Sequence, residues 1–412
     1  MTTIPDVQTA ESRALQLAAR LLLEYNLRAE RLEYQLRRLA AHLRIEAQIH
    51  IAYRHVTIVA DGRTLTVQAP ELRINVAVSL GTLNIIDALC ADRIGLDEGL
   101  RRLESIERTA TRHARWLLVL IFGLGAAALA WLLGADRGAI AVSGVSSALG
   151  LIARQELGKR RAALLVLPFT GALIGAALAG VATRLGWTQT AGLALTVPAL
   201  MLVPGPHAIN GVADILENYL ETGVSRLVLA SAILVSAALG GVLGGWLTLH
   251  SIDVPAATAA TTPIPLLLDI GLAGVAACAF GAFYNAPWRV LWISIACGVV
   301  GHGIRWLCLS EGMSVTLSTS LACAAIGVMA NIAAERLRLP FSAISFAGAV
   351  PMMPGVFMYQ SLAGAIQLGV AGQAADPARL AVTVALIFKA AFVVIGMVIG
   401  LLAGARLTRW HR

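Results

Sequence analysis

The chain has 412 residues, of which 58% are hydrophobic and 14% are charged, and its formal net charge is +8. A water-soluble protein of this length would expose far too much apolar surface at such a balance, so most of the chain is expected to lie in a lipid bilayer. The basic residues cluster beside apolar runs, where the positive-inside rule accounts for them better than a nucleic-acid partner does.

Residues 1–115 are expected to form a small cytoplasmic α/β domain. Between Thr9 and Leu43, leucines recur with a helical rhythm. Segments 55–60 and 63–68 alternate apolar and polar residues and are joined by Asp61-Gly62, which predicts a β-hairpin. The beginning of the chain is charged and amphipathic, so no cleavable signal peptide is expected.

Ten apolar segments follow. At about 1.5 Å per residue, each spans or nearly spans the roughly 30 Å hydrocarbon core. The second segment is short and rich in Gly and Ser, while the fourth and ninth are long. The segments cover about residues 116–134, 138–153, 162–183, 187–218, 226–249, 264–285, 288–309, 314–334, 340–369 and 380–404.

The fourth and ninth segments contain equivalent Pro-Gly pairs. Pro204-Gly205 and Pro354-Gly355 lie 150 residues apart. Each pair should interrupt a membrane helix, because Pro removes a backbone donor and Gly tolerates unusual dihedrals. The freed backbone groups need protein, water or a ligand, so matched breaks point to the binding site of a transporter.

The expected fold class is an α-helical polytopic membrane protein with ten transmembrane helices. Five segments per half make the second half enter from the opposite side, which gives two inverted five-helix repeats with Pro-Gly-broken fourth helices. The repeats cover residues 116–250 and 264–412, behind the N-terminal α/β domain. Basic loops alternate with acidic or neutral ones, which places both termini in the cytoplasm of a multi-pass protein of the cell (inner) membrane.

Polar residues follow the first break on one helical stripe, at His207, Asn210 and Asp214. The half-helix that begins at Gly205 offers free N–H groups and the positive end of its dipole to a carboxylate. Gln360 matches Asn210, since each is an amide five residues beyond its glycine. Facing each other, the two amides could bind a small zwitterion, and His207 and Asp214 are candidates for proton coupling.

Several of these residues have a plainer interpretation. His207 could be a core histidine bonded to the broken backbone, and Asp214 a helix-end charge in water. Glu217 and Glu221 are expected to form a solvated face. Lys389 lies roughly 13 Å deep in the tenth segment, where snorkelling is difficult. We expect it to face the central cavity and to bind a carboxylate or pair with Asp214.

The remaining motifs argue against catalysis and bound metal. The sequence has no Walker A loop, HExxH or GxSxG element, and an ATP-driven pump would need a separate subunit to supply the energy. The cysteines have no metal-ligand spacing, so neither a metal site, a disulfide framework nor a cofactor is expected. They are Cys90, Cys278, Cys297, Cys308 and Cys323.

Motifs along nearly the whole chain carry a family resemblance. Arg31 and Glu33 fit a Gly-Ala-x-Thr-x-Arg-Val-Glu pattern, although Asn26 and Ala29 stand where Gly and Thr are expected. Further matches are Asn84, 95–100, Pro204-Gly205, Asn210-Gly211, Asp214, 223–227, Pro287, Pro340, Pro354-Gly355 and Tyr359. On these motifs the chain resembles the threonine/serine exporter family, the ThrE-type carriers. The second half looks like a smaller partner protein that is separate in some bacteria.

The resemblance implies export of threonine and serine driven by the proton motive force, whereas related split systems are associated with succinate or other dicarboxylates. The leading expectation is a secondary, proton-coupled exporter of small hydrophilic amino acids by alternating access. A dicarboxylate exporter, a membrane-anchored sensor or enzyme that uses the N-terminal domain, and a passive channel are the alternatives. A homo-oligomer is left open. The substrate-binding candidates are Pro204, Gly205, His207, Asn210, Pro354, Gly355, Gln360 and Lys389.

Overall fold

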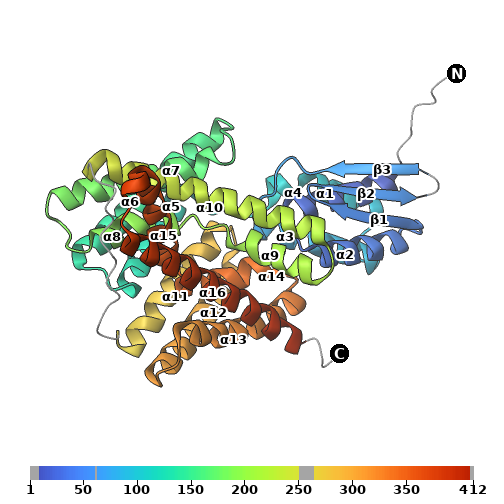
Figure 1. Cartoon of the computed structure of the whole chain (residues 1–412). Helices are drawn as coiled ribbons and strands as arrows, with labels where there is room; N and C mark the ends of the chain where they lie inside the picture. The colour runs from blue at the N-terminus through green and yellow to red at the C-terminus, as the bar shows by residue number, and fades with distance from the viewer. Residues whose placement is uncertain (1–8, 61–62, 250–263, 409–412) are drawn as a thin grey trace.

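The computed structural model describes residues 9–60, 63–249 and 264–408 (Figure 1). Seven of its helices are long and apolar enough to cross a membrane, and nine spans result if each of two sharply bent helix pairs counts as one. The chain is therefore a mostly helical, polytopic membrane protein. The expected number of ten spans is not reached on this criterion, because the second expected segment falls in a helix that is less apolar than the others.

The N-terminal part contains four helices and one three-stranded sheet. We call α1–α4 with β1–β3 the N-terminal unit, which lies to one side of the membrane helices (Figure 1). Its elements are α1 (Ala10–Glu24), α2 (Ala29–His42), β1 (Ala47–Ala52), β2 (His55–Ala60), β3 (Arg63–Gln68), α3 (Val76–Cys90) and α4 (Leu96–Thr109).

The sheet is antiparallel, in the order β1-β2-β3. His55 pairs with Gln68 and Ala60 with Arg63, so the two alternating segments do pair as the sequence predicts. The connecting Asp61-Gly62 lies outside the described residues. Strand β1, in which Ile49 and Ile51 alternate with polar residues, adds a third strand that the sequence analysis did not anticipate.

The helical rhythm from Thr9 to Leu43 does not form one helix. A loop of four residues, Tyr25 to Arg28, separates α1 from α2. Helix α1 ends there because Asn26 adopts a left-handed backbone conformation with a φ of 59°. The leucines on both sides of the loop still share one core, in which Leu22 and Leu36 are fully buried.

Two groups of membrane helices follow. The first comprises α5 (Arg115–Leu132), α6 (Arg137–Lys159), α7 (Val166–Arg184), α8 (Ala191–Leu200), α9 (Gly205–Leu216) and α10 (Leu220–Leu249). The second comprises α11 (Leu266–Phe283), α12 (Trp288–Ser310), α13 (Val315–Leu337), α14 (Phe341–Ala349), α15 (Gly355–Ala371) and α16 (Pro377–Leu407), with short 3-10 turns η1 (Val350–Met352) and η2 (Gly372–Ala374).

The same pattern of packing recurs in the two groups. In the first, α7 lies along α10, and in the second α13 lies along α16. Glycines allow the backbones to touch in both pairs: a Cβ on Gly244 would lie 2.3 Å from the carbonyl oxygen of Leu173, and one on Gly404 would lie 2.0 Å from that of Ala324. Small residues at such crossings are typical of packed membrane helices.

We therefore expect Gly404→Ala to destabilise the protein, because the methyl group would collide with backbone that only a helix shift can move. The expected loss is about 1–3 kcal/mol, the usual cost of overpacking. Thermal unfolding of the purified protein in detergent measures it. Gly271→Ala is the matched control, since a Cβ there meets nothing within 4 Å. Equal unfolding temperatures for the two variants would contradict the prediction.

Candidate functional site

Each Pro-Gly pair lies at a sharp bend in the chain. The helices bend by 60° between α8 and α9 and by 73° between α14 and α15. The two prolines have nearly the same backbone conformation, with φ and ψ of −85° and 51° at Pro204 and of −79° and 41° at Pro354. In both cases the following glycine begins the next helix. The first N–H groups of α15 have no partners within that helix, whereas in α9 Pro206 has no N–H and the His207 N–H donates to the Pro204 carbonyl at 3.2 Å.

Both breaks are packed against the other half of the chain. A Cβ on Gly205 would lie 1.8 Å from a ring carbon of Phe346 in α14, and a Cβ on Gly355 would lie 2.0 Å from a methyl carbon of Leu200 in α8. A larger residue at Gly205 would collide with the Phe346 ring, whereas one at Gly355 would force the Leu200 side chain to move. Each break thus packs against a side chain from the opposite half of the chain.

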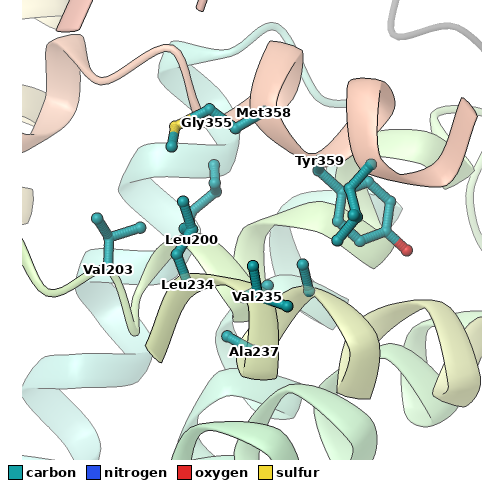
Figure 2. A pocket seen from close by; sticks show the side chains of 11 residues that line it. Leu200, Val203, Leu234, Val235, Ala237, Gly355, Met358 and Tyr359 are labelled. Atoms are coloured by element: carbon teal, nitrogen blue, oxygen red, sulfur yellow. The ribbon is translucent and has the colours of Figure 1, made fainter. Parts of the chain in front are cut away.

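A pocket lies where α8, α10 and α15 meet, beside the second break (Figure 2). Its volume is about 120 Å³, and its lining is apolar except for Tyr359. The Tyr359 hydroxyl is buried, with no hydrogen-bond partner in the described part of the chain. Burying a charged group without hydrogen-bond partners is costly, so in this conformation the pocket is too apolar for a zwitterion alone.

His207 lies directly after the first break and is buried, with 5% of its surface exposed. Its Nδ1 atom has no hydrogen-bond partner among the described residues. The histidine is therefore not fixed to the broken backbone through that nitrogen. The role of His207 in proton coupling stays a prediction.

Asn210 and Asp214 bind the connection between α1 and α2, and not the second half of the chain. The Asn210 side-chain amide donates to the Asn26 carbonyl at 2.6 Å, and Asp214 Oδ1 accepts from the Ala29 backbone N–H at 2.9 Å. Asn210 and Asp214 are completely buried. The stripe predicted to follow the first break thus contacts the N-terminal unit.

Arg226, at the start of α10, completes this cluster. Its guanidinium donates to Asp214 Oδ2 at 2.6 Å and to the Leu27 carbonyl at 2.7 Å, and it is fully buried. No role for the Arg226 side chain was expected from the sequence, where it lies within the matched stretch 223–227. The signal that could have revealed it is its position twelve residues after Asp214, across the turn that reverses the chain between α9 and α10.

Around this pair the contact between α9–α10 and the N-terminal unit is polar. Arg28 pairs with Glu217 at 3.0 Å, and the Tyr219 hydroxyl donates to Glu33. Glu217 is therefore not part of the solvated face that was expected, since only 16% of its side chain is exposed. The reason is that Glu217 is paired with Arg28. Glu221, one turn further on, is exposed as expected.

Gln360 and Lys389 lie elsewhere. Gln360 lines a cleft of about 370 Å³ between α15 and α16. Lys389 is on an exposed face of α16, with its ammonium 4.4 Å from the centre of the Phe357 ring. The structure thus does not bring Gln360 to Asn210, nor Lys389 to Asp214, in this conformation. Their joint role in binding stays a prediction.

The second half also contains a buried pair that the sequence analysis did not recognise. Nδ1 of His302 in α12 lies 2.7 Å from a carboxylate oxygen of Asp269 in α11. Spacing could not reveal the pair, because its members are 33 residues apart on different helices.

We expect removal of one partner of the Asp214–Arg226 pair to destabilise the protein strongly. Asp214→Asn leaves the guanidinium buried without its counter-charge, a change that typically costs about 3–5 kcal/mol. The double variant Asp214→Asn, Arg226→Met should recover part of the loss, because no charge is left buried. Thermal unfolding measures both, with Arg101→Gln, from an exposed pair on α4, as the control. A double variant no more stable than Asp214→Asn would contradict the prediction.

Comparison with known proteins identifies the family. Residues 13–248 match the family model of ThrE, a threonine/serine exporter, and residues 269–405 match a second model, "Threonine/Serine exporter, ThrE". No solved structure matches the chain. Both family models describe transporters and not enzymes.

Among curated proteins, the chain is 30% identical over 133 residues to "Probable succinate transporter subunit YjjP" of Klebsiella aerogenes, covering 32% of this chain and 52% of that protein. The protein of the same name from Escherichia coli K12 is 27% identical over 133 residues, with the same shares. The chain thus matches about half the length of these curated relatives. Because the first family model alone covers more than half of the chain, the chain belongs to the ThrE family of threonine/serine exporters.

Proposed function

We propose that this chain is a secondary active exporter of small amino acids, foremost threonine and serine, that works by alternating access of two inverted five-helix repeats. The observation that carries the proposal is the pair of similar bends at Pro204-Gly205 and Pro354-Gly355, each seated against the other half of the chain. Carriers built from inverted repeats bind their substrates at such interrupted helices.

The contacts between connecting loops support this topology. The loops after α9, α11 and α13 all touch the N-terminal unit, through Glu217, Asn285 and Arg338. The loops after α5 and α7 meet each other through Asp136 and Thr190. Ten membrane passes would place these two sets of loops on opposite sides of the membrane. Helix α6 counts as one of the passes, since its 23 residues span about 35 Å.

In this proposal the N-terminal unit and both termini lie in the cytoplasm, and the protein lies in the inner membrane. The Asp214–Arg226 pair and the loop from Tyr25 to Arg28 then close the cytoplasmic end of the first broken helix. Alternating access requires these contacts to separate during part of the cycle. Asp214, once its partner has moved away, and His207 are the proposed carriers of the coupled proton.

A dicarboxylate exporter is the second candidate. The printed names of the relatives in Klebsiella aerogenes and Escherichia coli describe a succinate transporter subunit. A cation such as Lys389, if it turns towards the substrate, would suit a second carboxylate. Substrate choice therefore separates the two candidates.

We expect labelled threonine and serine to undergo counterflow in liposomes that contain the protein, and an imposed pH gradient to increase it. The gradient should act because export is proposed to be coupled to proton entry. Succinate counterflow without that of the amino acids would favour the second candidate. If threonine, serine and succinate all enter the liposomes but none accumulates above its equilibrium concentration, the protein is a passive channel.

We also expect Gly205→Ala to lower threonine counterflow at least about tenfold, because the new methyl group collides with the Phe346 ring. Gly205→Ala combined with Phe346→Ala should recover transport, since it restores the space at the contact. Gly369→Ala serves as the control, as a Cβ there meets nothing within 4 Å. If Gly205→Ala transports normally, close packing of the breaks is not required for the cycle.

A further inference from the structure

A second, larger cleft lies between the N-terminal unit and the second group of membrane helices. Its volume is about 520 Å³, which is enough for an amino acid, and it lies apart from the Pro-Gly breaks. Residues of α2 and α3 form one wall, and Glu335 and Arg338 from the end of α13 form the other. A ligand in this cleft would therefore touch both parts of the protein.

The lining of the cleft contains groups that bind a carboxylate. Four arginines line it, at positions 28, 31, 38 and 338, against three carboxylates, at positions 30, 87 and 335. Guanidinium groups are the side chains best shaped to bind a carboxylate with paired hydrogen bonds.

Two of these guanidinium groups share one carboxylate. Arg38 reaches one oxygen of Asp87, and Arg338 reaches the other. Each guanidinium has five N–H donors, and within the described residues no further partner of either group is found. The remaining donors can therefore bind a second carboxylate in the cleft.

Arg338 lies at the C-terminal end of α13. Its backbone has a φ of 59°, the left-handed conformation that commonly ends a helix. The chain turns there, and the Arg338 side chain contacts Asp87 in α3.

A hydrogen-bond acceptor also lines the cleft beside the arginines. Gln35 lines the cleft with only 6% of its surface exposed, and its side-chain oxygen has no hydrogen-bond partner in the part of the chain that the structure describes. A buried unsatisfied oxygen costs free energy that an N–H or O–H donor would recover. The ligand should therefore carry such a donor as well as a carboxylate.

We propose that this cleft binds a small amino acid, with its carboxylate on Arg38 and Arg338 and its ammonium or hydroxyl on Gln35. The site is distinct from the Pro-Gly breaks and bridges the N-terminal unit to α13. The choice of amino acid as ligand rests on the proposed function. Occupancy of the site would hold the N-terminal unit against the membrane helices, because the ligand bonds to both.

Binding of serine and threonine to the full chain in nanodiscs, followed by isothermal titration calorimetry, tests the proposal. Beside any binding at the Pro-Gly breaks, we expect a saturable site whose affinity falls at least about tenfold in Arg338→Gln and in Gln35→Leu, since each loses a bond to the ligand. Arg101→Gln, on the exposed face of α4, should bind as the unchanged protein does. Unfolding temperatures show that the variants are folded.

Three results would overturn the proposal: no binding of either amino acid, equal binding by Arg338→Gln, or acetate bound as tightly as serine. Binding of succinate alone would likewise overturn the amino-acid assignment. The variant Gly205→Ala separates this site from transport, because it should bind serine in the cleft even when counterflow is lost. Serine binding in a protein without any counterflow would leave the site standing and overturn the proposed export instead.

Discussion

The ion pair of Asp214 and Arg226 depends on a loop from a distant part of the chain. Burying two charges costs several kcal/mol for each, and their attraction offsets this only if the remaining hydrogen-bonding groups are also satisfied. Here the Ala29 N–H and the Leu27 carbonyl supply two of those bonds. Folding of the α9–α10 turn and docking of the N-terminal unit are consequently one event, and neither is expected to persist without the other.

Because of this dependence, opening the cytoplasmic end in the proposed cycle costs free energy. Opening the cytoplasmic end would return Asp214 and Arg226 to water, where a separated pair is inexpensive, while it would leave the loop without its partners. At the starts of α9 and α15, the contacts of Gly205 with Phe346 and of Gly355 with Leu200 join the two breaks. A movement at one break therefore has to be accommodated at the other, as concerted alternation requires.

Local features were predictable from the sequence and distant contacts were not. The bends at Pro204 and Pro354 follow from backbone chemistry, and the pairing of β2 with β3 follows from alternation over a few residues. The bond between Arg226 and Leu27 spans 199 residues, which no periodicity encodes. Equivalent positions in the two halves also acquired different neighbours: the N-terminal unit covers Asn210, and nothing comparable covers Gln360 among the described residues.

The loop between α1 and α2 is recognised through its main chain. Its groups bound by Asn210, Asp214 and Arg226 are two carbonyl oxygens and one amide N–H, which every residue except proline can provide. Among the residues that supply these bonds, only Asn26 is constrained by its backbone, because its positive φ favours Gly or Asn. The side chains of Tyr25 and Arg28 bond elsewhere, to Glu107 and Glu217. The main-chain contact with Asn210, Asp214 and Arg226 does not depend on those side chains, and a search for invariant loop side chains would overlook it.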